Sequence, residues 1–87
     1  MNTVWKYELK IEDYQYLTVP FGAKLLCVKM QNDVPVLYAL VNENEHDTQN
    51  IAIRCVGTGH GIHEDNTEYL GIIMMFDGKL VFHHFKI

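Results

Sequence analysis

The most constraining feature of this sequence is a pair of long apolar runs that meet across Asp77-Gly78. Residues 67–76 precede this dipeptide and residues 79–87 follow it. Asp-Gly between apolar runs favours a type I′ turn, because both residues tolerate the positive φ that this turn requires at its central positions. The sequence therefore predicts a closing β-hairpin with a two-residue loop.

A two-residue loop fixes the register of this hairpin by counting outward from the turn. The expected cross-strand pairs are Phe76 with Lys79, Met75 with Leu80, Met74 with Val81, Ile73 with Phe82, Ile72 with His83, and Leu70 with Phe85. Because successive pairs alternate faces, both faces of the hairpin are apolar. We therefore expect one face to line the core and the other to meet a second sheet, a partner chain or a ligand.

Five further apolar runs precede the hairpin, with the two-residue period or the apolar continuity that is typical of strands. The expected strands span residues 3–9, 14–19, 24–31, 34–41 and 51–56. The segment Pro20–Ala23 ends the second strand, and Asn32-Asp33 is expected to form a tight turn. The fourth strand is apolar at every position after Pro35, which predicts a central place in its sheet.

No window of the sequence shows a 3.6-residue apolar period, and the links between apolar runs are short. This pattern predicts an all-β fold, a small antiparallel meander of about seven strands rolled into a partly open barrel. At most one short helical turn is expected, near Glu12 or residues 64–68. The 87 residues are expected to form a single domain, 1–87, with a modest core.

Charge and hydropathy exclude several classes of function. A net charge of −4 argues against general nucleic-acid binding, which requires clustered lysine and arginine. No apolar run approaches the roughly 20 residues of a membrane helix, and residues 1–6 lack the apolar core of a signal peptide. We therefore expect a cytoplasmic protein without membrane contact. Cys27 and Cys55 fall in apolar strand patterns and are expected to be reduced core residues.

The most unusual stretch is the glycine-rich segment 57–61. Its three glycines allow backbone amides to approach a ligand closely and to form a concave site for an anion. The same composition is typical of a β-bulge or a corner at which a barrel bends, so both interpretations stay open. The expected ligand-binding residues are Gly57, Thr58, Gly59 and His60, with Lys24, Arg54 and Trp5 beside them.

Five histidines raise the question of a metal site. His60 and His63 have an H-x-x-H spacing, but His83 and His84 are adjacent in one strand and therefore point to opposite faces. His83 shares a face with Phe85, which favours a hydrogen-bonded histidine in the core or at its rim. We expect neither a metal nor another cofactor.

The sequence also lacks a recognisable catalytic constellation. It contains no serine, and a Cys–His pair would place Cys27 or Cys55 outside the apolar surroundings that raise a thiol pKa. Glu64 and Asp65 are neighbours in one loop, whereas acid–base hydrolysis uses opposed carboxylates. These features predict a protein that is not an enzyme.

An ordered set of short motifs runs along nearly the whole chain. The motifs are Trp5-Lys6-Tyr7, Pro20–Lys24, Gln31-Asn32, Leu37–Val41, Gly57–His60 with Ile62, Tyr69–Gly71 and Gly78–His83. With this set the chain resembles a family of short uncharacterised proteins encoded by tailed phages, prophages and their bacterial hosts. The resemblance implies a genetic context and no particular activity.

The leading hypothesis is a non-enzymatic phage accessory protein that binds a host target and inhibits a defence system. It would occlude a host defence protein or sequester a small anionic signal such as a nucleotide. The sequestering form predicts a homo-oligomer with pockets between chains near segment 57–61. Two alternatives are a small nucleotide- or metabolite-acting enzyme that uses His60 or His63, and a structural module of a virion or of phage DNA metabolism.

Overall fold

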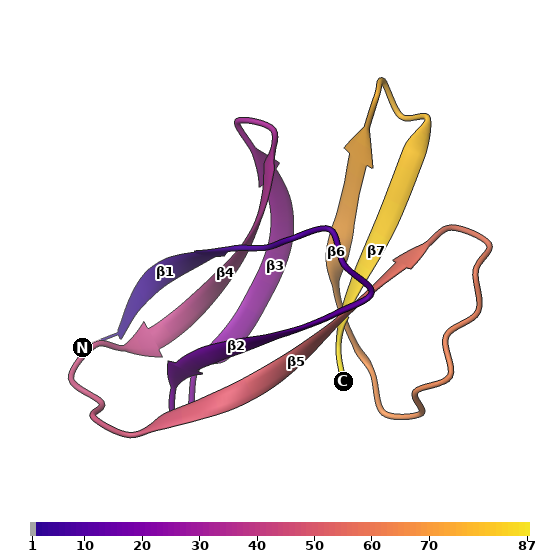
Figure 1. Ribbon diagram of the computed structural model, residues 1–87. Helices are drawn as coiled ribbons and strands as arrows, with labels where there is room; N and C mark the ends of the chain where they lie inside the picture. Colours follow the sequence, from indigo (N-terminus) through magenta and orange to yellow (C-terminus); the bar gives the residue numbers. More distant parts are fainter. Residues whose placement is uncertain (1) are drawn as a thin grey trace.

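The computed structural model describes residues 2–87, which form seven strands and contain no helix (Figure 1). The strands are β1 (Asn2–Glu8), β2 (Tyr14–Pro20), β3 (Lys24–Gln31), β4 (Val34–Asn42), β5 (Thr48–Gly57), β6 (Glu68–Met75) and β7 (Leu80–Lys86). The predicted all-β class and number of strands are confirmed. Within residues 2–87 nothing forms a helix of the length and hydropathy needed to span a membrane.

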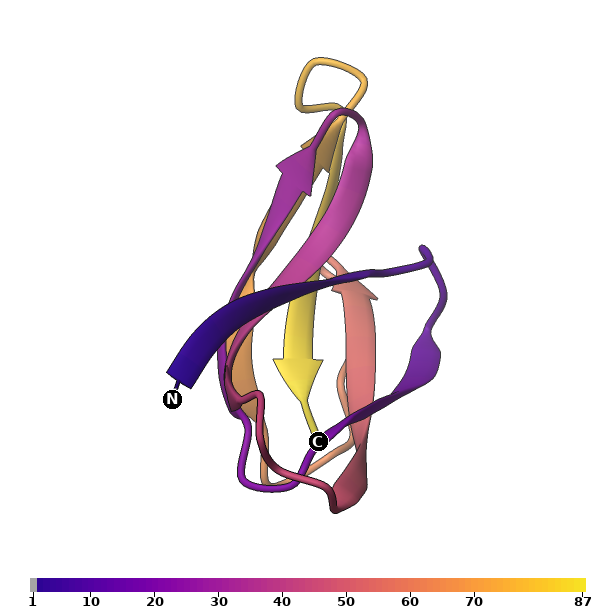
Figure 2. The same ribbon diagram turned by 90° about the vertical axis from the view of Figure 1, so that its left-hand side faces the viewer.

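The strands form two antiparallel sheets, with the orders β1-β4-β3 and β2-β5-β7-β6. Only β3–β4 and β6–β7 are hairpins of consecutive strands, so the strand order differs from that of a simple meander. β3 and β6 lie in contact between the sheets, and the chain passes from β1 into β2 at the other side (Figure 2). The result is a partly open barrel, as predicted.

The C-terminal hairpin has the predicted register near its turn and a different one near its base. The pairs from Met75–Leu80 to Ile72–His83 are confirmed, whereas the expected pair of Leu70 with Phe85 is wrong. Tyr69 pairs with Phe85 instead, because β6 has a bulge at which Leu70 is an extra residue. The bulge places Leu70 in the core, where its exposure is 3%.

The turn of this hairpin is closed by a hydrogen bond of 3.1 Å from the Lys79 amide to the Phe76 carbonyl. Asp77 and Gly78 have φ of 57° and 82°, as a type I′ turn requires. Phe76 also has a positive φ, 52°, which a bulky residue rarely adopts. The other predicted tight turn is confirmed as well, since Asn32 and Asp33 have φ of 49° and 67°.

The core lies between the two sheets and receives buried side chains from β2 to β6 and from Leu9 just after β1, with the partly buried Phe82 of β7 packed against it. Its buried members are Leu9, Val19, Leu25, Val28, Leu37, Ala39, Val41, Ile51, Ile53, Leu70 and Ile73. The prediction of a central fourth strand is confirmed, because β4 lies between β1 and β3. One apolar face of the C-terminal hairpin enters this core, whereas Ile72 and Met74 on its other face are 38% and 58% exposed.

A close approach of backbones joins the sheets where β3 meets β6. Gly71 has a φ of 140°, and a Cβ atom there would lie 2.7 Å from the carbonyl oxygen of Val28. No side chain fits at that distance, so glycine is required for this contact. We call the contact between Val28 and Gly71 the seam.

Candidate functional site

The glycine-rich segment forms a corner that follows β5. The His60 amide donates a 3.0 Å hydrogen bond to the Gly57 carbonyl, and the Thr58 amide donates one of 3.2 Å to the Val81 carbonyl. Gly59 has a φ of 88°, so the corner uses the positive φ that glycine tolerates. The His60 ring lies against Gly57, where an added Cβ would be 3.2 Å from Nδ1. The stretch is therefore a bend, as one of the two interpretations expected.

The same corner forms a wall of two small pockets. One pocket, of about 310 Å³, is lined by Thr58, His60, Lys79 and Phe82 among others. The second, of about 180 Å³, lies on the side of Ile62, His83 and Phe85. Lys79 was not anticipated as a site residue, although its position directly after the Asp-Gly turn was a usable signal. Whether the corner binds a ligand stays a prediction.

His83 is held on the outer face of the second sheet. Its Nε2 lies 2.8 Å from the Thr58 hydroxyl and its Nδ1 lies 2.9 Å from the Tyr69 hydroxyl. Tyr69 also packs edge-on against Phe85, with ring centroids 5.2 Å apart. The expected hydrogen-bonded rim histidine is confirmed. Its bond to Thr58 anchors the start of the loop at residues 58–67 to the sheet, and its bond to Tyr69 joins β7 to β6.

His84 points to the opposite face and is fully buried beside Cys55, its cross-strand partner. Neither ring nitrogen of His84 has a hydrogen-bond partner among residues 2–87. Burial lowers the pKa of His84 to about 4, with a further contribution from His83, and burial raises the pKa of the Cys55 thiol. Both groups are therefore neutral at pH 7, and this pair does not form the thiolate and imidazolium of a cysteine nucleophile.

Arg54 contacts Tyr14 and Glu64, and we call this group of three side chains the latch. The Arg54 Nε lies 3.2 Å from Glu64 Oε1, and the Tyr14 hydroxyl donates a 2.8 Å hydrogen bond to the same oxygen. The guanidinium stacks 4.6 Å from the centroid of the Tyr14 ring. The hydrogen bond from Tyr14 lowers the pKa of the Glu64 carboxyl. The latch thus ties the middle of the loop to β2 and β5.

The remaining expected site residues lie in the other sheet. Trp5 is in β1 opposite Ala39, and Lys24 is in β3 opposite Leu40. Neither lines the pockets beside His60. The structure therefore brings Gly57, Thr58, Gly59 and His60 together, engages Arg54 in the latch, and separates Trp5 and Lys24 from them.

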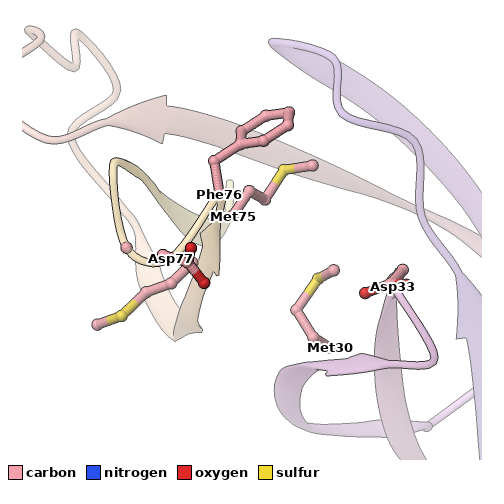
Figure 3. Close-up of a pocket in the computed structure, with 7 residues that line it drawn as sticks. Met30, Asp33, Met75, Phe76 and Asp77 are labelled. Carbon is pink, nitrogen blue, oxygen red and sulfur yellow. The ribbon is translucent and has the colours of Figure 1, made fainter.

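A larger cavity than these two lies elsewhere, between the ends of the β3–β4 and β6–β7 hairpins, and we call it the tip cleft (Figure 3). Its volume is about 600 Å³. Met30 and Asp33 stand on one side, and Met75, Phe76 and Asp77 stand on the other. Phe76 is 68% exposed. This site was not predicted from the sequence, although an aromatic residue directly before a tight turn was a signal.

The candidate sites differ in the side chains that line them. Within residues 2–87 no three histidine, cysteine, aspartate or glutamate side chains gather as a metal site would require. The tip cleft combines thioether and aromatic surface with two carboxylates, and the pocket beside His60 combines a lysine, an imidazole and a hydroxyl.

Residues 1–87 match a family described as a domain of unknown function, DUF7352. No curated protein and no solved structure matched the chain.

Proposed function

Because the chain belongs to the DUF7352 family, whose description states no activity, we propose a function from the geometry of the chain itself. The protein is a non-enzymatic phage accessory protein that occludes a host protein and so inhibits a defence system. The phage context rests on the motif resemblance, from Trp5-Lys6-Tyr7 to the C-terminal hairpin. The mode of action rests on the tip cleft.

Phe76 is the observation that carries this proposal. Its side chain is 68% exposed, and its backbone has a φ of 52°. A positive φ costs a bulky residue on the order of 1–3 kcal/mol. An asparagine or glycine would form the same turn without that cost. An aromatic ring that is both exposed and held at a strained position supports a role in contact with another molecule.

The apolar surface continues from the tip along the outer face of β6. Met74 is 58% exposed and Tyr69 is 54% exposed, with Ile72 between them along the strand. Exposed aromatic and methionine side chains are enriched where proteins contact one another. The continuity of this surface with Phe76 supports a protein partner over a small molecule at the tip.

Photo-crosslinking tests the proposal directly. Phe76 is replaced by benzoylphenylalanine in the full chain, the protein is irradiated in phage-infected bacteria, and the crosslinked protein is identified and purified. We expect the purified partner to form a stoichiometric complex with the wild-type protein. It should bind the Phe76→Asn variant roughly thirtyfold more weakly, since an interface hot spot contributes about 2 kcal/mol.

Phe21→Asn is the matched control, because Phe21 is a 60% exposed phenylalanine in a different turn. Its binding should equal that of wild type. Equal binding by Phe76→Asn and Phe21→Asn would contradict occlusion through the tip. Turnover that depends on His60 or His63 would contradict the non-enzymatic proposal.

A second candidate function is sequestration of a small anion such as a nucleotide. It is favoured by one observation, the pocket of about 310 Å³ that Lys79 and His60 line together with the Thr58 corner. This form of the proposal includes a homo-oligomer. Native mass spectrometry of protein purified from infected cells should then show a multimer with retained ligand mass, and Lys79→Met should lose that mass. A monomer without retained ligand mass, for both the wild-type protein and Lys79→Met, would contradict the sequestration proposal.

A further inference from the structure

The charged side chains that line the tip cleft are all acidic. Asp33 and Asp77 are both exposed, and each stands at the turn of a different hairpin, so a carboxylate flanks the cleft on either side (Figure 3). Among the described residues that line the cleft, none is basic. The cleft therefore presents apolar walls between two negative charges.

We propose that the tip cleft takes a basic segment of a partner protein. An aliphatic or aromatic side chain of the segment enters between the walls, and a neighbouring lysine or arginine meets Asp33 and Asp77. This inference rests on the proposed function, because it specifies the chemistry of the host protein that is occluded.

The apolar half of the proposal follows from the walls. Three of the four methionines in the chain, Met30, Met74 and Met75, line the cleft. Thioether side chains are flexible and polarizable, so they adapt to aliphatic and aromatic surfaces alike. A volume of about 600 Å³ is within the range of clefts that bind small molecules or side chains. Phe76 supplies an aromatic contact at the same site.

The basic half of the proposal follows from charge complementarity. The two carboxylates and the net charge of −4 attract a cationic segment and repel an anionic one. A nucleic acid would bring phosphates to this position. A second copy of the chain, docked cleft to cleft, would bring two further carboxylates. The charges therefore favour a basic protein segment over both.

Methyl NMR with ¹³C-methionine provides the test, because the labelled side chains lie in the cleft walls. Three synthetic peptides share a Leu-Phe centre and are flanked by lysine, by glutamine or by glutamate. We expect the lysine peptide to shift the methyl signals of Met30 and Met75 and to bind about fivefold more tightly than the glutamine peptide. That advantage should shrink in high salt. The glutamate peptide should bind most weakly.

The double variant Asp33→Asn/Asp77→Asn isolates the carboxylates. Asparagine tolerates the positive φ of both positions, so the turns are retained. The variant should bind the lysine peptide no better than the glutamine peptide. The control variant Glu43→Gln/Asp47→Asn changes the net charge equally in an exposed loop between β4 and β5. It should keep the preference for lysine.

The outcomes separate this inference from the proposed function. Equal binding of the lysine and glutamine peptides, or no methyl shift with any peptide, overturns the basic-segment inference. Loss of the lysine preference in both double variants also overturns it, because the preference would then follow net charge and not the cleft. The proposed function stands or falls separately, on the crosslink at Phe76 and the affinity of Phe76→Asn.

Discussion

The seam and the tip cleft are formed by the same two hairpins, and they differ in nearly every physical respect. At the seam, the backbones of Val28 and Gly71 approach so closely that no side chain fits between them. At the tips, the hairpins part around a cavity of about 600 Å³. At the seam, Gly71 and the buried Leu70 lie where the two sheets meet. At the tip, Phe76 is exposed and has a strained backbone. The comparison separates the part that holds the fold from the part available for contact.

The largest effect is expected at the seam, from Gly71→Ala. An added Cβ would lie 2.7 Å from the Val28 carbonyl oxygen at a φ of 140°. Backbone strain and overpacking together should lower the free energy of unfolding by roughly 3–5 kcal/mol. Urea denaturation followed by circular dichroism measures this change.

Gly22→Ala is the matched control for that substitution. Gly22 also has a positive φ, 84°, but an added Cβ would meet nothing within 4 Å. Only the strain remains, so the expected loss is about 1 kcal/mol. Equal losses at the two glycines would show that the sheets are not in close contact at Gly71.

The second effect also belongs to the seam, because His84 is the cross-strand partner of Gly71. Burial lowers the pKa of His84 from 6.5 to about 4, so between these values the unfolded chain binds more protons than the folded one. Stability is then complete above pH 6.5 and falls as the pH drops toward 4. The expected loss is about 3 kcal/mol, from the linkage between pKa and folding.

His84→Phe tests the origin of this acid sensitivity. Phenylalanine keeps a ring in the core and removes two nitrogens that find no hydrogen-bond partner in the described chain. The variant should be at least as stable as wild type at pH 7 and should lose most of the dependence on pH. An unchanged pH profile would assign the sensitivity to other groups.

A third effect, smaller than these, concerns the latch, which belongs to neither region. Glu64→Gln removes the carboxylate that pairs with Arg54 and accepts the Tyr14 hydrogen bond. Amide hydrogen exchange in residues 58–67 should become several-fold faster, while the urea midpoint changes little. Tyr14→Phe keeps the ring beside Arg54 and should have a weaker effect. Equal exchange rates of residues 58–67 in wild type, Glu64→Gln and Tyr14→Phe would mean that the latch does not order the loop.

The smallest effect has the opposite sign and lies at the tip. Phe76→Asn replaces a residue strained at a φ of 52° by one that tolerates this conformation. The free energy of unfolding should rise by about 1 kcal/mol, while the affinity for the partner falls roughly thirtyfold. A decrease in the urea midpoint would place Phe76 among the residues that stabilise the fold, and the contrast between seam and tip would disappear.

Local pattern predicted the strands and turns of this fold because both depend on neighbouring residues. Alternation located the strands, and Asn32-Asp33 and Asp77-Gly78 located the two tight turns. The bulge at Leu70 was missed because it accompanies the approach of β6 to β3, which counting from the turn does not reveal. The strand order could not be derived from the sequence for the same reason, since β1 with β4 and β2 with β5 are long-range pairs.

The candidate sites divide in the same way. The cluster at Gly57–His60 was visible because its members are consecutive, and the separate faces of His83 and His84 followed from strand geometry. The tip cleft was not visible, because Asp33 and Phe76 come together only when two distant hairpins lie side by side. Trp5 and Lys24 were grouped with the corner on residue type alone, and the sheet order separates them from it.

The bulge in β6 has a consequence at the level of codons. Tyr69 faces Phe85 and Gly71 faces His84 as consecutive rungs of the ladder, with Leu70 between them and paired to neither. Loss of that single codon would leave every remaining rung in register and remove one core side chain. Leu26 occupies a comparable position in β3, but its side chain is 41% exposed. The two hairpins thus each carry one supernumerary leucine, and only the one beside the seam is built into the interior.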